Sequence, residues 1–231
     1  DSKHGYNVDR MITSTQKSLD YFDAHYTPYQ HKQVRILEFP NYQGFAQSFA
    51  NTIPYSESIG FIADLRDKEA IDYVFYVTAH ELAHQWWAHQ VIGAAVQGST
   101  MLSESLSQYS ALMVMEKEYG REKMRRFLRY ELDRYLSGRG GEAIEEQPLA
   151  RVGGQQYIHY NKGSLVFYRL RDELGEEALN RALKRYLQDK GFQQAPFTTT
   201  LELLAYIRAE APQDKQALIT DLFEKIVFYD N

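Results

Sequence analysis

The stretch VTAHELAHQWW, residues 77–87, contains two histidines four positions apart and a glutamate directly after the first. On an α-helix, residues four apart lie almost over one another, so His80 and His84 can direct both imidazole rings at one ion. Glu81 lies roughly 100° further round the helix, close enough to hold a water molecule on that ion without binding the ion itself. The pattern predicts a helix that carries a metal site with a carboxylate base beside it.

The alternative interpretation of these polar residues is a helix face that is exposed to water. The small and apolar residues among them, Thr78, Ala79, Leu82 and Ala83, suit a packed helix better. A five-residue pattern with three fixed letters also arises by chance in a chain of this length with a probability of only about 1%. We therefore interpret the stretch as a metal site.

A catalytic zinc ion normally takes three protein ligands and leaves one position for water. The same stretch does not supply a third histidine, because Trp87 and Gln90 occupy the positions where the metzincin pattern needs glycine and histidine. His89 comes one residue too early and points away round the helix, so we expect it at the surface or behind the ligands. The metzincin interpretation therefore fails.

The other source of a third ligand is Glu104, in the segment MLSESLSQYSALM, with nineteen residues between it and His84. That interval lets one helix end, the chain turn through Gly98, and a second helix bring its first turn against the site. An acidic residue near a helix start is also favoured by the helix dipole, without any ligand role. Given the pair of histidines, we expect Glu104 to be the third ligand.

The composition is that of an ordinary globular protein. The 231 residues are 44% apolar and 25% charged, with a formal net charge of −5 and no cysteine. No Lys/Arg stripe is interleaved with aromatic residues, so we expect no nucleic-acid partner. The missing cysteines exclude disulfides and cysteine-ligated metals but leave the compartment open. No window approaches eighteen consecutive apolar residues, so we expect no membrane span within the chain.

Hydrophobic periodicity and turn residues predict a small β region followed by a helical body. The first expected elements are a helix at 7–25, a strand at 33–40 that ends at a proline, a strand pair or edge strand at 53–65, and a helix from Asp67 to about Val91. The later elements are helices bounded by glycine or proline: one from the break at 98–100 to Gly120, one at about 121–136 followed by a flexible turn at 137–141, one at roughly 155–174, one between Gly175 and Gly191, and two more separated by Pro212.

We expect a single domain, residues 1–231, of the α+β class with mainly helical content. Its small β-containing part covers about 30–66, and its helical body covers about 67–231. No internal repeat and no linker-like change of composition divides the chain. The sequence opens at Asp1 without an initiator methionine, so we also expect it to be a fragment of a longer protein.

Three motifs in this order carry a resemblance to a known family: HELAHQWW, a glutamate about twenty residues later, and YNKG at 160–163. With them the sequence resembles the zinc aminopeptidases of the membrane alanyl aminopeptidase family, which are gluzincins with a thermolysin-like catalytic domain. The resemblance covers most of the chain, from the strand near Val34 to the helix after Tyr160. It implies the thermolysin-like fold and a peptide substrate.

The resemblance also implies a role for each residue of the site. His80, His84 and Glu104 would bind one Zn²⁺ per chain, and Glu81 would be the base that activates water. Tyr160 would donate a hydrogen bond to the oxyanion that forms as the scissile carbonyl becomes tetrahedral. A neutral tyrosine suits that role because it donates a hydrogen bond without adding a full charge.

The family also uses a Gly-x-Met-Glu-Asn segment upstream of the zinc helix, whose glutamate holds the free α-amino group of the substrate. We assign this segment to PYSES, residues 54–58, which places Glu57 at the amine-binding position. The other letters differ, since Pro54, Ser56 and Ser58 replace glycine, methionine and asparagine. This departure weakens the implied aminopeptidase specificity more than the implied hydrolysis, and a plain strand-end glutamate is the alternative for Glu57.

Further departures concern spacing and context. The interval to Glu104 is one residue longer than the family's usual eighteen, and Ser103 stands where the family commonly has asparagine. The chain also lacks the family's large N-terminal β-sheet domain and long C-terminal helical domain. Residues 89–120 are similar to bacterial relatives in which the peptidase domain follows multi-pass, transporter-like membrane segments. On that similarity we expect membrane attachment in the full-length protein, with the peptidase domain outside the cytoplasm of a bacterium.

Three functions are compatible with these features. The first is zinc-dependent hydrolysis of peptide bonds by a metal-activated water, with removal of N-terminal residues as the specific activity of a metalloaminopeptidase. The second is a metallo-endopeptidase that needs no free N-terminus. The third is a non-catalytic, zinc-stabilised binding module of a membrane transport protein. Glu81 argues against the third function, because a purely structural zinc site does not need a base.

Overall fold

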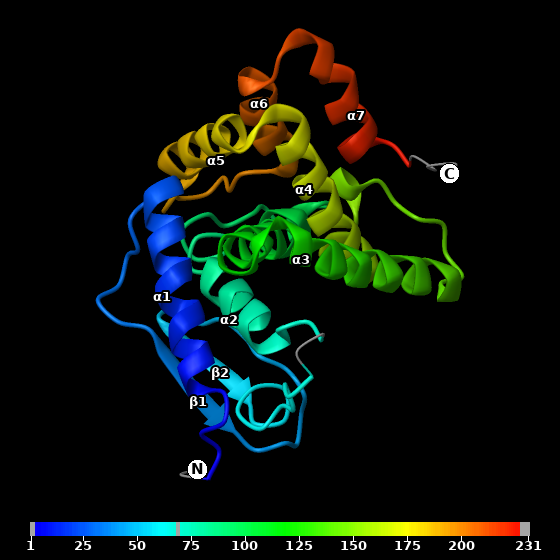
Figure 1. The fold of residues 1–231 in the computed structure, drawn as a ribbon. Coiled ribbons are helices and arrows are strands. Elements are labelled where there is room, and N and C mark those ends of the chain that lie inside the picture. The colour runs from blue at the N-terminus through cyan, green and yellow to red at the C-terminus, as the bar shows by residue number, and fades with distance from the viewer. Residues whose placement is uncertain (1–2, 68–69, 227–231) are drawn as a thin grey trace.

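The computed structural model describes residues 3–67 and 70–226, so positions 68 and 69 of the helix expected from Asp67 lie outside the described residues. Helices dominate and one small sheet lies near the N-terminus, as the α+β prediction required (Figure 1). The elements are α1 (Val8–His25), β1 (Arg35–Phe39), β2 (Thr52–Ser56), α2 (Tyr73–Ala83), α3 (Leu106–Gly141), α4 (Gly163–Leu174), α5 (Glu176–Lys190), α6 (Thr200–Glu210) and α7 (Gln216–Glu224).

The sheet occupies one end of the molecule, beside α1 and α2, while α5 to α7 lie at the opposite end (Figure 1). Strands β1 and β2 run parallel, with Arg35 opposite Thr52. On the other edge of β2 the chain segment 45–49 runs antiparallel, with bridges that join Ala46 to Tyr55 and Phe49 to Thr52. β2 therefore has a neighbour on both sides, and residues 45–49 form the outer edge.

Helix α2 packs between α1 and α3 and begins at Asp72, whose side chain accepts a hydrogen bond from the backbone N–H of Phe75. It ends at Ala83, earlier than the predicted Val91. The following residues are fixed by tertiary contacts instead. The buried Trp86 donates its indole N–H to the carbonyl of Thr27, and the buried Trp87 donates to the hydroxyl of Ser110. These two indoles lie in the core, so the chain leaves the helix where they need to turn inward.

Helix α3 is interrupted at Gly120, where the sequence predicted a stop, because this glycine adopts the non-helical angles φ 80° and ψ 160°. The expected helices on either side of Gly120 are therefore two segments of one kinked helix. The segment 137–141, expected as a flexible turn, is the last turn of this helix. A Cβ added at Gly138 would lie 2.5 Å from Cβ of Tyr157. Close packing against a neighbouring segment thus accounts for a glycine inside this helix.

Two π-helical turns, Met101–Ser105 and Tyr157–Lys162, lead directly into α3 and α4. They contact each other, because the hydroxyl of Ser105 donates a 2.6 Å hydrogen bond to the carbonyl of His159. The periodicity predicted regular helix at both places. Single π-turns inside helices are frequent at functional sites, and each of these turns contains one of the predicted site residues.

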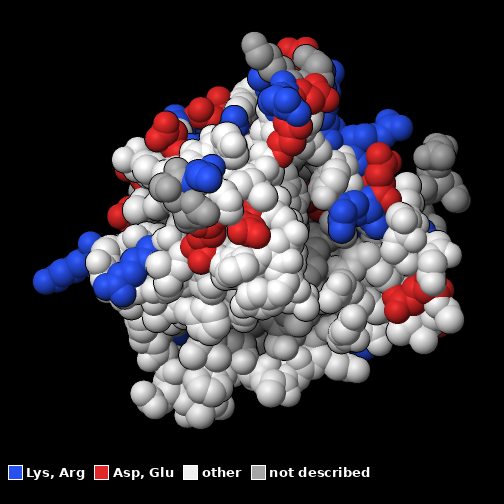
Figure 2. All heavy atoms as spheres, turned by 90° about the horizontal axis from the view of Figure 1, so that it is seen from below, with Lys and Arg blue, Asp and Glu red and all other residues white. Residues whose placement is uncertain are grey.

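The surface carries mixed charge. On the face shown in Figure 2, basic and acidic side chains occur near each other over the upper part and at both sides, and the lower part is largely uncharged. This mixture agrees with the small net charge of −5. None of the helices in residues 3–67 and 70–226 is both long and apolar enough to cross a membrane.

The contact between the two π-turns gives a stability prediction. A Cβ added at Gly163 would lie 2.3 Å from Oγ and 2.7 Å from Cβ of Ser105. We expect Gly163→Ala to lower the free energy of unfolding by about 1–3 kcal/mol through overpacking, as measured by urea denaturation. The control is Gly140→Ala in α3, where nothing lies within 4 Å and alanine favours the helix. Equal stability of the two variants would contradict the prediction.

Candidate active site

Three predicted ligands converge at the end of α2. His80 lies in its last turn, His84 caps its C-terminus, and Glu104 comes from the π-turn before α3. The two Nε2 atoms are 3.0 Å apart, and Oε2 of Glu104 lies 3.3 Å from Nε2 of His80 and 3.4 Å from Nε2 of His84. A tetrahedral zinc ion with bonds of about 2.05 Å separates its ligand atoms by about 3.3 Å. The triangle therefore has the size and the ligand chemistry of a zinc site.

The ionised state of the Glu104 carboxylate also suits the binding of a cation. Its Oε2 is buried and has no hydrogen-bond partner within the described part of the chain, which is costly for a carboxylate oxygen unless an ion binds there. Burial alone would raise the pKa of Glu104, but the nearby His80 and His84 imidazoles lower it well below its ordinary value. The carboxylate is therefore an anion throughout the neutral range.

The ring of His84 is held in one orientation. Its Nδ1 lies 3.0 Å from the carbonyl of Trp87 and 3.0 Å from the hydroxyl of Ser107, so an Nδ1–H can donate to this carbonyl. That tautomer leaves the lone pair of Nε2 directed at Glu104, as is usual for a metal-binding histidine. Burial lowers the pKa of His84, but the Glu104 carboxylate, 3.4 Å from Nε2, outweighs it and raises this pKa to about 8.

Glu81 is buried beside the ligands and lines the space around them. Burial raises the pKa of its carboxyl above the ordinary value, and the imidazoles of His80 and His84 oppose the rise only in part. A carboxylate with a raised pKa accepts a proton more readily, which suits a general base. The pKa is thus raised in Glu81 and lowered in Glu104.

Tyr160 approaches the same place from the π-turn before α4. Its ring centroid lies 6.1 Å from that of His80, and it lines the space on both sides of the site. Burial and the negative charge of Glu104 raise the pKa of Tyr160 above its ordinary value. The phenol therefore keeps its proton and remains a hydrogen-bond donor.

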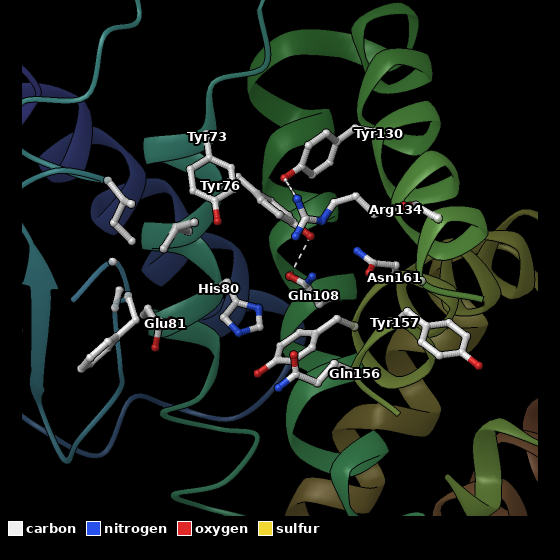
Figure 3. A pocket seen from close by; sticks show the side chains of 18 residues that line it. Tyr73, Tyr76, His80, Glu81, Gln108, Tyr130, Arg134, Gln156, Tyr157 and Asn161 are labelled. Atoms are coloured by element: carbon white, nitrogen blue, oxygen red, sulfur yellow. Dashed lines mark hydrogen bonds between the residues drawn. The ribbon is translucent and has the colours of Figure 1, made fainter. Parts of the chain in front are cut away.

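Two cavities flank these residues and share His80, Glu81, Ala46 and Tyr160 as lining. The larger, of about 780 Å³, lies between α2 and α3 (Figure 3). The smaller, of about 360 Å³, includes Ser48, His89 and Glu104. His89, expected at the surface or behind the ligands, is half-buried in this smaller cavity. A chain that crosses the site would have space on either side of the ligands.

Glu57 does not lie where the sequence placed it. Its carboxylate accepts a 2.9 Å hydrogen bond from the backbone N–H of Asn41 and lies 3.5 Å from Nδ1 of His4, and it lines neither cavity. The reason is the pairing of β2: the edge that faces the site belongs to residues 45–49, and Ala46, Gln47 and Ser48 line the smaller cavity. Glu57 therefore lies outside both cavities, and the amine-binding role predicted for it stays a prediction.

Sequence reasoning also missed a buried network behind the site. The Tyr76 hydroxyl lies 2.7 Å from Oε1 of Gln108 and 2.9 Å from Oε1 of Glu131, and Asn161 donates a 2.6 Å hydrogen bond to Oε2 of Glu131. The network joins α2 and α3 to Asn161, the residue after Tyr160. Helical spacing could have indicated only two of these residues, because Tyr76 lies one turn before His80 and Gln108 one turn after Glu104. Glu131 gives no such signal.

The chain matches the model of the peptidase family M1 domain over residues 10–221. Curated relatives include endoplasmic reticulum aminopeptidase 2 of Homo sapiens, 24% identical over 193 residues, and aminopeptidase N of Lactobacillus delbrueckii subsp. lactis, 27% identical over 192 residues. These alignments cover 80% and 78% of this chain but only 20% and 22% of the relatives. The chain thus spans about a fifth of their length.

Solved structures share the fold. A crystal structure of an M1 zinc metallopeptidase from Deinococcus radiodurans superimposes with a TM-score of 0.66 at 19% identity, over 91% of this chain and 43% of that one. A mutant of the same metallopeptidase gives a TM-score of 0.70 at 18% identity, over 94% of this chain and 45% of that one.

The raised pKa of His84 predicts how the stability of the metal-free protein depends on pH. The folded pKa of about 8 exceeds the ordinary value of 6.5, so this stabilisation is complete below pH 6.5 and is lost as pH rises through 8. We expect the free energy of unfolding of chelator-treated protein to fall by about 1 kcal/mol from pH 7 to 9. In the same interval zinc should bind more tightly, because fewer His84 side chains hold a competing proton.

Urea denaturation and zinc titration at pH 7, 8 and 9 test this prediction. The interval lies above the range in which His25, His89 and His159 titrate, since burial lowers the pKa of each of them. The variant His84→Asn should lose the pH dependence of stability. A metal-free protein that becomes more stable from pH 7 to 9 would refute the assignment.

The position of Glu57 predicts a neutral substitution. Glu57→Gln keeps an acceptor for the N–H of Asn41 and removes only a charge outside both cavities. We expect kcat/KM for an aminoacyl fluorophore to stay within about two-fold of the parent value, and the preference for a free over an acetylated N-terminus to be unchanged. A loss of ten-fold or more that is confined to free-amine substrates would restore the amine-binding role.

Proposed function

The chain belongs to peptidase family M1, and from this premise we propose that it is a zinc-dependent metallopeptidase that removes N-terminal residues from peptides. The observation that carries the proposal is the triangle of His80, His84 and Glu104, with sides of 3.0, 3.3 and 3.4 Å. The curated relatives support it, because they are named as aminopeptidases. The chain covers only 20% of the length of the human relative. That the full-length protein has this activity is therefore also part of the proposal.

His80, His84 and Glu104 would hold one zinc ion per chain. When bound, zinc would lower the pKa of a coordinated water and polarise the scissile carbonyl. Glu81, with its raised pKa, accepts the proton of the attacking water and delivers it to the leaving amine. Tyr160 donates its phenolic hydrogen bond to the oxygen on which negative charge develops. Its own proton is secure, because burial and Glu104 raise its pKa.

The selection of a free N-terminus rests on other groups than Glu57. Among the described residues that line the two cavities, the only carboxylates are Glu81 and Glu104, and both have roles in the reaction. Uncharged acceptors such as Gln47 and Ser48 would then receive the α-amino group. Such acceptors discriminate less than a charged clamp would. For this reason hydrolysis of N-blocked peptides, as by an endopeptidase, is the second candidate function.

The binding-module alternative is the least supported of the three. Glu81 is buried next to the ligands, and burial raises the pKa of its carboxyl. Burial of a carboxyl destabilises the folded protein, so its presence beside a metal site favours a catalytic role over a purely structural one. Kinship to the membrane alanyl aminopeptidases in particular, and attachment to transporter-like membrane segments outside the cytoplasm, are proposals that the motifs of the sequence support. Fractionation of cells that express the full-length protein tests the attachment, and recovery in the soluble fraction alone would refute it.

The roles of Glu81 and Tyr160 predict distinct losses. Glu81→Gln should lower kcat by several orders of magnitude, because proton transfer loses its acceptor, while zinc stays at one ion per chain. Tyr160→Phe should lower kcat by about 100-fold, the usual effect of removing one oxyanion donor, with little change in KM. Elemental analysis and steady-state kinetics with an aminoacyl fluorophore measure both.

The matched control for the tyrosine is Tyr206→Phe in α6, whose hydroxyl donates to Asp189 far from either cavity. It should leave kcat unchanged. A Glu81→Gln variant as active as the parent, or a parent that retains no zinc after purification without added metal, would refute the proposed function.

A further inference from the structure

The larger cavity carries a net positive charge if Glu81, which takes part in the reaction, is not counted. Of the described side chains that line it, Glu81 is the only carboxylate and Arg134 the only permanent cation. Glu81 lies at the ligands and is committed to the attacking water. A substrate group that extends from the site into this cavity therefore meets one positive charge and no second carboxylate from the described part of the chain. That charge comes from the second segment of α3, 30 residues after Glu104 in the sequence.

Arg134 points into the cavity. Figure 3 shows its guanidinium extending from α3 toward Gln108, beside Tyr130, on the side of the cavity that faces Tyr73 and Tyr76 of α2. The Tyr130 ring lies 5.4 Å from its guanidinium carbon, and the Tyr130 hydroxyl accepts a 3.2 Å hydrogen bond from it. This contact positions the guanidinium and leaves most of its five N–H donors for a ligand.

No carboxylate of the described chain lies within ion-pairing distance of Arg134. The nearest acidic group in its helix turn, Glu131, is buried, and both its oxygens are occupied by Tyr76 and Asn161. The other acidic neighbour, Asp133, lies 3.6 Å from Arg129 on the exposed side of α3. Arg134 is therefore a solvent-exposed cation at the wall of the cavity, held by Tyr130 and without a carboxylate partner among residues 3–67 and 70–226, which is an arrangement suited to an anionic ligand.

Gln108 completes the subsite. Its side chain is buried, and its Oε1 lies 2.7 Å from the Tyr76 hydroxyl, whose single proton is shared between Gln108 and Glu131. That contact orients the amide so that its N–H₂ group is the donor available to a ligand. A planar guanidinium and an amide N–H together match the two oxygens of a carboxylate.

We propose that Arg134 and Gln108 form a subsite that binds a carboxylate of the substrate, so that the enzyme prefers peptides with an acidic group near the scissile bond. The proposal rests on the proposed function, because it assumes that the cavity beside Glu81 receives a peptide. The carboxylate has two possible sources, a Glu or Asp side chain and the C-terminus of a short peptide. Both offer the same chemistry, and peptides of defined sequence separate them.

The test is equilibrium binding to the Glu81→Gln variant, which retains the cavity and does not turn peptides over. The probes are amidated alanine tripeptides that carry Glu, Gln or Lys in turn at each position, together with trialanine as free acid and as amide. At one position, or at the C-terminus, the carboxylate should bind about ten-fold more tightly than its amide counterpart. Lysine at that position should bind more weakly than glutamine.

The second variant is Arg134→Gln in the same background, which should abolish the difference between carboxylate and amide. Its matched control is Arg129→Gln, which removes a cation from the exposed face of α3 and should leave the ten-fold preference intact. Equal binding of all acid and amide pairs by the Arg134-containing protein would overturn the proposal. Persistence of the preference after Arg134→Gln would overturn it as well.

Turnover by the protein with intact Glu81 separates this proposal from the proposed function. Hydrolysis of neutral peptides without any advantage for acidic ones would refute the carboxylate subsite and leave the peptidase assignment in place. The reverse result, acid-selective binding that depends on Arg134 without hydrolysis of any peptide, would support the subsite and refute the activity.

Discussion

The close approach of one buried carboxylate to two imidazoles is the constraint on which the rest of this structure depends. Glu104 lies within 3.3–3.4 Å of His80 and His84, although these residues come from different helices. The helices must be held together tightly for such a contact to form. Trp86 and Trp87 provide much of this packing, and the carbonyl of Trp87 also fixes the ring of His84. The core and the metal ligands are thus positioned by the same residues.

The environment gives two chemically identical side chains different roles. Burial raises the pKa of Glu81, whereas in Glu104 the adjacent imidazoles outweigh burial and lower the pKa. One glutamate is therefore prepared to accept a proton and the other to remain an anion. A divergence of this kind between neighbouring carboxyls is the usual means by which one site supplies both a base and a permanent negative charge. The assignment of roles follows from burial and neighbours, not from the residue type.

Features of the fold and the site that depend on residues close together in the sequence could be predicted from it, whereas features that depend on distant residues could not. The ligand pair of His80 and His84 follows from the helical repeat, glycines correctly bounded α5, and Pro212 correctly separated α6 from α7. Glu57 lies outside both cavities because residues 45–49 occupy the edge of β2 beside the site, a pairing that local sequence does not encode. Arg134 could not be connected to the site for the same reason, since a kinked helix brings it back from far along the chain.

The π-turn Met101–Ser105 has a consequence for how such a site can change during evolution. A π-turn accommodates one extra residue within a helix without altering the packing of the helix that follows. Loss of a single codon there would restore regular helix and rotate the preceding residues by about 100° relative to α3. Glu104 would turn away from the two histidines while the core of the helical body stayed in place. Inactive descendants of this chain could therefore arise in one genetic step and still fold.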